Sequence, residues 1–134
     1  MRIIAIDYGD VRTGVAVSDL TGSIAGEAYV IEQRDAGRLA ERLAADARER
    51  GAETLVLGYP KNMDGTLGVR AEKSQALAEL LRAAGFAVVL WDERRTTIAA
   101  HDILSANNRH GKKRKQTVDA VAATLILEGY LASL

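Results

Sequence analysis

The chain begins Met1-Arg2-Ile3-Ile4-Ala5-Ile6-Asp7-Tyr8-Gly9, an apolar run that ends in an acid and a glycine. The stretch from Arg2 to Ile6 is nearly all apolar and rich in isoleucine. Such a run is typical of a strand buried on both faces in the middle of a sheet. The start of the chain therefore predicts a central strand that carries Asp7 at its end, where Gly9 permits close approach of the backbone to a ligand.

The rest of the chain alternates between strand-like and helix-like patterns. Short runs rich in β-branched residues predict strands, and apolar residues at helical spacing predict amphipathic helices that stop at glycines. The predicted strands are Arg2–Ile6, Gly14–Ser18, Ala28–Glu32, Thr54–Leu57 and Ala87–Trp91. The predicted helices are Asp35–Arg50, Val69–Ala84, a short one from Thr97 to about Ala106, and a last one from about Thr117.

This order, βββαβαβαα, predicts an α/β fold. Three strands with short connections indicate an antiparallel meander, and the next two helices each link two parallel strands by a right-handed crossover. We therefore expect a mixed five-stranded sheet with helices on both faces. The length of 134 residues fits a single domain spanning 1–134.

Composition restricts the class of protein. Hydrophobic residues make up 48% and charged residues 27% of the chain, which is typical of a soluble globular protein. Cysteine is absent, which excludes disulfides and cysteine-ligated zinc and favours a reducing compartment. No apolar run is long enough for a membrane span, and Asp7 interrupts any signal peptide. We expect a cytoplasmic protein with no membrane partner.

The net charge is zero, with 18 basic and 18 acidic residues, but the charges are unevenly distributed. The segment 94–118 holds seven lysines and arginines against one acid, Asp102. The net charge is zero because the positive charge of segment 94–118 is balanced by an excess of acids in the rest of the chain. We expect Ser105–Gln116 to be a polar, basic and mobile loop that binds phosphates. Aromatic residues are only 4%, which disfavours extensive base stacking.

Three acids are candidates for a shared metal site. Asp7 and Glu93 follow strands whose carboxyl ends should meet at one edge of the sheet, and Asp119 is expected in the first turn of the last helix. Clustered carboxylates repel one another, and a hard cation such as Mg²⁺ removes that cost. Two such ions also promote phosphodiester hydrolysis. We therefore expect Asp7, Glu93 and Asp119 to be metal ligands and catalytic residues.

Each acid also has a simpler interpretation. Asp7 could be a turn residue, Glu93 could pair with Arg94 or Arg95, and Asp119 could be favoured by the helix dipole. The metal-site interpretation depends on all three acids reaching one edge. Polar and basic residues around that edge, including the loop Gly58–Thr66, are candidates for nucleic-acid contact. They are Arg12, Lys61, Asn62, Arg70, Arg94, Arg95, Lys112, Lys113, Arg114 and Lys115.

Several motifs together resemble the YqgF family of bacterial proteins, also called RuvX. They are Asp7-Tyr8-Gly9 with Arg12 and Gly14, Gly58-Tyr59-Pro60 with Asn62-Met63-Asp64-Gly65, Asp92-Glu93-Arg94 with Thr96-Thr97, and Val118-Asp119-Ala120 with Ala122-Ala123 and Ile126-Leu127. The resemblance spans nearly the whole chain and implies an RNase H-like fold. Asp7, Glu93 and Asp119 match the acidic motif residues of the family. Tyr59 and Arg95 depart from it, since the family often has an aliphatic residue and leucine there.

The resemblance implies an endonuclease that uses two Mg²⁺ or Mn²⁺ ions to process the 5′ end of precursor 16S ribosomal RNA. The alternative substrate is a four-way DNA junction, whose two symmetric cuts require a homodimer. Monomer and homodimer both stay open. Asp7-x-Gly9 with Gly14 also resembles the phosphate loop of the actin and sugar-kinase superfamily, which binds ATP between two such domains. A further alternative is a non-catalytic module that binds RNA or protein.

Overall fold

The computed structural model describes residues 2–22, 25–59, 68–92 and 111–134, the last range without the side chains of 111–117. The strands are β1 (Ile3–Asp7), β2 (Arg12–Ser18), β3 (Ala25–Glu32), β4 (Thr54–Tyr59) and β5 (Ala87–Asp92). The helices are α1 (Ala36–Arg50), α2 (Val69–Ala83) and α4 (Gly111–Ala132). Most predicted boundaries differ from these by a few residues at most.

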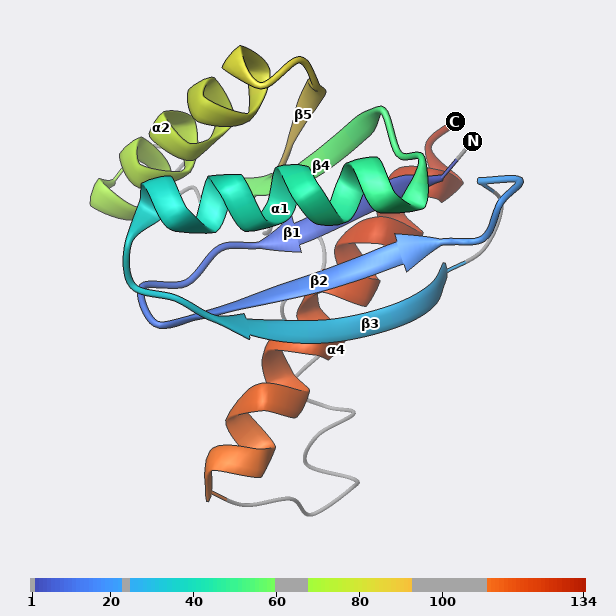
Figure 1. The fold of residues 1–134 in the computed structure, drawn as a ribbon. Helices are drawn as coiled ribbons and strands as arrows, with labels where there is room; N and C mark the ends of the chain where they lie inside the picture. The colour runs from blue at the N-terminus through green and yellow to red at the C-terminus, as the bar shows by residue number, and fades with distance from the viewer. Residues whose placement is uncertain (1, 23–24, 60–67, 93–110) are drawn as a thin grey trace.

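The five strands form one mixed sheet in the order β3-β2-β1-β4-β5. The β1–β2 and β2–β3 pairs are antiparallel, whereas β1–β4 and β4–β5 are parallel. Helices α1 and α2 cover one face and α4 crosses the other (Figure 1). The predicted meander, crossovers and two-sided cover are therefore confirmed, and β1 is the central strand.

The two faces of the sheet carry side chains of different size. On the α1–α2 side, large residues such as Ile4, Ile6 and Leu57 form the main core. On the α4 side, β1 and β2 present the small residues Ala5 and Ala16, whereas β5 presents Trp91. Because alternate residues of a strand point to opposite faces, this pattern follows directly from the strand sequences. It lets the backbone of α4 lie close to the sheet.

Helix α4 begins earlier than the sequence predicted. It starts at Gly111, so 111–116 belong to the helix and not to a mobile loop that continues to Gln116. Lysine, arginine and glutamine are good helix formers, but they produce no apolar periodicity that would reveal a helix. These first turns project beyond the edge strand β3 (Figure 1). The predicted short helix after β5 lies outside the described residues.

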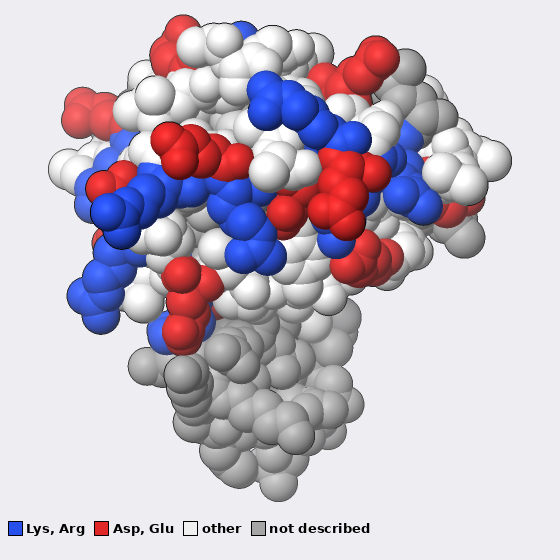
Figure 2. Space-filling view, viewed as in Figure 1, with Lys and Arg blue, Asp and Glu red and all other residues white. Residues whose placement is uncertain are grey.

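Charged side chains of both signs are mixed on the face covered by α1 and α2 (Figure 2). Arg50 of α1 illustrates this, because it makes a two-pronged ion pair with Glu27 of β3, with nitrogen–oxygen distances of 3.1 and 3.0 Å, and stacks over Tyr29. Mixed charges do not form a surface that attracts a polyanion. None of the helices in the described ranges combines the length and apolar character needed to span a membrane.

Candidate active site

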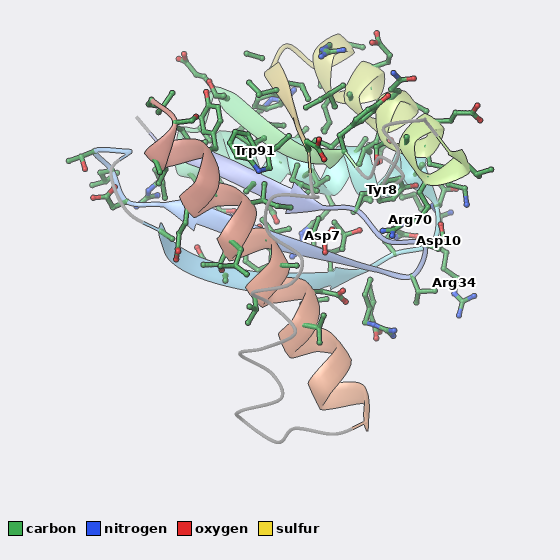
Figure 3. The ribbon with its side chains drawn as sticks, turned by 180° about the vertical axis from the view of Figure 1, so that it is seen from behind. Asp7, Tyr8, Asp10, Arg34, Arg70 and Trp91 are labelled. Carbon is green, nitrogen blue, oxygen red and sulfur yellow. The ribbon has the colours of Figure 1, made fainter. Side chains whose placement is uncertain are left out.

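Asp7 lies at the end of the central strand, as predicted. It is the last residue of β1 and stands opposite Gly14 of β2 in the antiparallel register. Ala5 of the same strand packs in the cluster beneath α4, so the alternation of the strand puts Asp7 on the α4 face as well. The carboxylate of Asp7 is thus presented toward α4, and Figure 3 labels it on that side of the sheet.

Asp119 reaches the same place from α4. The main-chain carbonyl of Asp119 lies directly over Gly14, and a Cβ built on Gly14 would overlap that oxygen. Because Gly14 pairs with Asp7, this close packing sets Asp119 beside the end of β1. The prediction that Asp119 occupies the first helical turn is wrong, since α4 starts at Gly111 and Asp119 lies more than two turns inside it. A favourable helix dipole therefore does not account for Asp119.

The two carboxylates influence each other electrostatically. Burial, and then the negative charge of Asp7, raise the pKa of Asp119 from 3.8 to about 6. The positive charges of Arg12 and Arg70 act in the opposite direction but are outweighed. A partly buried acid with an elevated pKa beside a second acid is a common feature of functional sites.

Two arginines border the acid pair. The Nε atom of Arg12, in β2, lies 3.6 Å from Oδ2 of Asp119. Arg70, in the first turn of α2, donates a long hydrogen bond of 3.5 Å to the main-chain oxygen of Tyr8. Figure 3 shows Arg70 next to Tyr8 and Asp10, two residues of the loop that follows β1. The structure therefore brings together four of the predicted site residues: Asp7, Arg12, Arg70 and Asp119.

A surface ion pair holds the loop after β1 against α2. Nζ of Lys73 lies 3.0 Å from Oδ1 of Asp10, and both side chains are largely exposed. Two residues further along α2, Gln75 donates a 2.8 Å hydrogen bond to the hydroxyl of Tyr59 at the end of β4. This bond gives the Tyr59 hydroxyl a polar partner although the residue is buried.

The other predicted site residues lie outside the described residues or in the projecting turns of α4. Glu93, Lys61, Asn62, Arg94 and Arg95 lie outside the described residues. The basic residues Lys112, Lys113, Arg114 and Lys115 lie in the projecting turns of α4, where only the backbone is described. Asp92, the neighbour of Glu93, is the last residue of β5. Because Trp91 packs beneath α4, strand alternation puts Asp92 on the opposite face of the sheet, away from Asp119.

The donors present fit a hard divalent cation. Asp7 and Asp119 offer carboxylate oxygens, which Mg²⁺ and Mn²⁺ prefer, and the mutual repulsion of the two acids is the cost that such an ion would remove. Within the described ranges, no group of three or more acids, histidines or cysteines is close enough to hold a metal. Glu93, the third acid predicted from the sequence, lies outside those ranges.

Arg12, which pairs with Asp119, also lines a depression that no sequence pattern predicts. It is open, has a volume of about 420 Å³, and is lined by Val11, Arg12, Glu32, Gln33 and Arg34. Arg12 thus borders both the depression and Asp119. Gln33 and Arg34 directly follow β3, and the signal that could have found them is the β2–β3 pairing, which sets Glu32 opposite Arg12.

Comparison with known proteins gives a consistent result along the whole chain. The profile of a family described as RuvX, Holliday junction resolvase, matches residues 1–133. A proposed pre-16S rRNA nuclease of Bacillus subtilis (strain 168) is 42% identical over 137 residues, covering 100% of this chain and 99% of that protein. A protein of the same description from Geobacillus thermodenitrificans is 45% identical, with 99% of each chain covered.

Solved structures with low sequence identity share the fold. RuvC of T. thermophilus, in complex with a Holliday junction substrate, has a TM-score of 0.63 and 13% identity, covering 99% of this chain and 97% of that one. The Fowlpox virus resolvase in complex with its junction DNA has a TM-score of 0.62 and 12% identity, covering 99% and 98%. These similarities confirm the predicted RNase H-like fold.

Proposed function

This chain belongs to the RuvX family of Holliday junction resolvases, and we propose that it is a divalent-metal-dependent endonuclease that processes the 5′ end of precursor 16S ribosomal RNA in the cytoplasm. The observation that carries the proposal is that Asp7 and Asp119 lie close together, with Arg12 and Arg70 next to them. The substrate is proposed from relatives that are more than 40% identical over nearly the whole chain and are described as proposed pre-16S rRNA nucleases.

The residues divide into two roles. Asp7, Asp119 and Glu93 would hold one or two Mg²⁺ or Mn²⁺ ions, which would activate water and neutralise charge on the phosphodiester. Arg12 and Arg70 stand beside the acids and supply positive charge for the phosphate oxygens. The other basic candidates, including 112–115 at the start of α4, would contact phosphates farther along the strand. The acids therefore act at the scissile bond, and the basic residues position the strand.

The alternative substrate is a four-way DNA junction. It is supported by the family description and by the fold shared with two junction-bound resolvases. A junction is cut at two symmetric positions, so this activity requires a two-fold dimer. The two substrates thus predict different active assemblies, since a monomer suffices for a single cut in RNA.

A side-by-side cleavage assay tests the proposal. Wild-type protein is incubated with precursor 16S RNA and with a four-way DNA junction, each with Mg²⁺, Mn²⁺ or EDTA. We expect cleavage of the RNA only with a divalent ion, and loss of that cleavage in Asp7→Asn. The matched control is Asp10→Asn, an exposed surface acid three residues away, which should cleave like the wild type. Cleavage by Asp7→Asn at the wild-type rate would refute the proposal, and preference for the junction would favour the alternative.

A further inference from the structure

The depression beside the acid pair has a well-defined wall. Arg12 and Glu32 are partners in the β2–β3 ladder, and the amide of Gln33 donates a 2.9 Å hydrogen bond to the main-chain oxygen of Val11. The side-chain oxygen of Gln33 in turn accepts a 3.1 Å hydrogen bond from the amide of Asp35, the cap of α1. The segment that bears Arg34 is thus fixed by backbone contacts on both sides.

The two arginines of the depression retain donors for a ligand. The 3.6 Å separation of Arg12 from Asp119 is an ion pair, but it is too long for a hydrogen bond, so Asp119 does not use up the N–H groups of Arg12. Arg34 is exposed and forms no ion pair with an acid of the described ranges. Figure 3 shows Arg34 at the same end of the sheet as Asp10 and Arg70.

We propose that this depression is a second phosphate-binding subsite, in which Arg34 and Arg12 hold the backbone phosphate adjacent to the one that is cleaved. The inference rests on the proposed function, because it takes Asp7 and Asp119 as the point of cleavage. The volume of about 420 Å³ lies within the range of pockets that bind small molecules and accommodates one nucleotide. Arginine suits this role because its planar group binds two phosphate oxygens at once.

The position of Arg12 links the depression to the proposed point of cleavage. Arg12 borders both Asp119 and the depression, so a strand whose phosphate is bound there passes next to the acid pair. Holding the neighbouring phosphate fixes the position of the scissile bond, which is a large part of the catalytic advantage in phosphoryl transfer. Glu32 has the opposite effect, since its negative charge beside Arg12 weakens the attraction for phosphate.

Binding measurements in the Asp7→Asn background test the subsite without cleavage. The probes are fluorescein-labelled single strands of RNA and DNA of about 12 nucleotides, followed by fluorescence anisotropy at several salt concentrations. We expect Arg34→Ala to weaken binding of both probes by about 5- to 20-fold and to reduce the salt slope by about 0.7. Glu32→Gln should strengthen binding by about 2- to 3-fold. Thermal unfolding of each variant establishes that it is folded.

The matched control is Arg38→Ala, which removes an exposed arginine one turn further along, in α1 and outside the depression. It should bind within about 2-fold of the parent protein. An Arg34→Ala variant that retains the affinity and salt slope of the Arg38→Ala variant would overturn the subsite, even if the enzyme cleaves RNA as proposed. Conversely, selective loss of binding in Arg34→Ala supports the subsite even if wild-type protein cleaves neither substrate. A protein that binds neither probe also overturns it.

Discussion

Gly14 sets the height of Asp119 above the sheet. The carbonyl oxygen of Asp119 occupies the space in which any other residue at position 14 would carry its Cβ. The same glycine pairs with Asp7 across β1 and β2. A single residue without a side chain therefore allows two acids from distant parts of the sequence to meet at one point.

Gly14→Ala should damage stability and activity together. The added methyl group overlaps backbone that cannot rotate away, so α4 must shift. We expect the free energy of unfolding to fall by about 1–3 kcal/mol, and cleavage to fall by about 100-fold as Asp119 is displaced. Denaturant unfolding and the cleavage assay measure the two effects.

Gly37→Ala is the control for that experiment. Gly37 lies in the first turn of α1, and a Cβ there would approach only the Asp35 side chain, at 3.2 Å. Because alanine favours a helix, this variant should be neutral or slightly more stable, by about 0.5–1 kcal/mol. Equal effects of the two substitutions would contradict the role given to Gly14.

The elevated pKa of Asp119 predicts a pH-dependent stability. Because the pKa of Asp119 is higher in the folded than in the unfolded protein, the protonated form of Asp119 favours the folded state. This contribution to stability is complete below about pH 4, where the acid is protonated in both states, and is lost as the pH rises through about 6. Without divalent ions, Asp119→Asn should therefore be more stable than wild type at pH 7, by about 1–3 kcal/mol. The difference should shrink toward pH 4.

Thermal unfolding in EDTA, at a series of pH values, measures this effect. Added Mg²⁺ should raise the melting temperature of the wild type at pH 7, since a bound cation relieves the repulsion between Asp7 and Asp119. The Asp119→Asn variant should gain much less. A wild type that is more stable than Asp119→Asn in EDTA at pH 7 would contradict the predicted electrostatic cost.

Arg50 is expected to anchor β3 to α1. Its guanidinium group pairs with both oxygens of Glu27 and stacks over the ring of Tyr29 at 5.2 Å. Arg50→Ala should lower the free energy of unfolding by about 1–2 kcal/mol. Arg38→Ala, from an exposed position of the same helix, should change it by less than about 0.5 kcal/mol. Urea unfolding compares the two, and equal values would remove the anchoring role.

Local patterns predicted the sheet and the approximate position of Asp7. A buried strand needs an unbroken apolar run, so the run before Asp7 marked both the central strand and its end. Helix α1 was equally clear, because its apolar residues recur on one face and Gly51 ends it. The start of α4 was missed because the basic residues of 111–116 form helix without an apolar stripe. The helical spacing of apolar residues appears in a sequence only where one face of the helix is buried.

The sequence by itself determined the five strands and their order, the helices α1 and α2, and the position of Asp7 at the end of the central strand, because these properties depend on neighbouring residues. Only the tertiary structure decided that Asp119 meets Asp7, that Arg12 pairs with Asp119, and that Arg34 borders the same depression. These contacts join segments far apart in the chain. They depend on how closely α4 packs on β2 and on the register of the β2–β3 pair, and neither distance nor register is encoded in a local pattern.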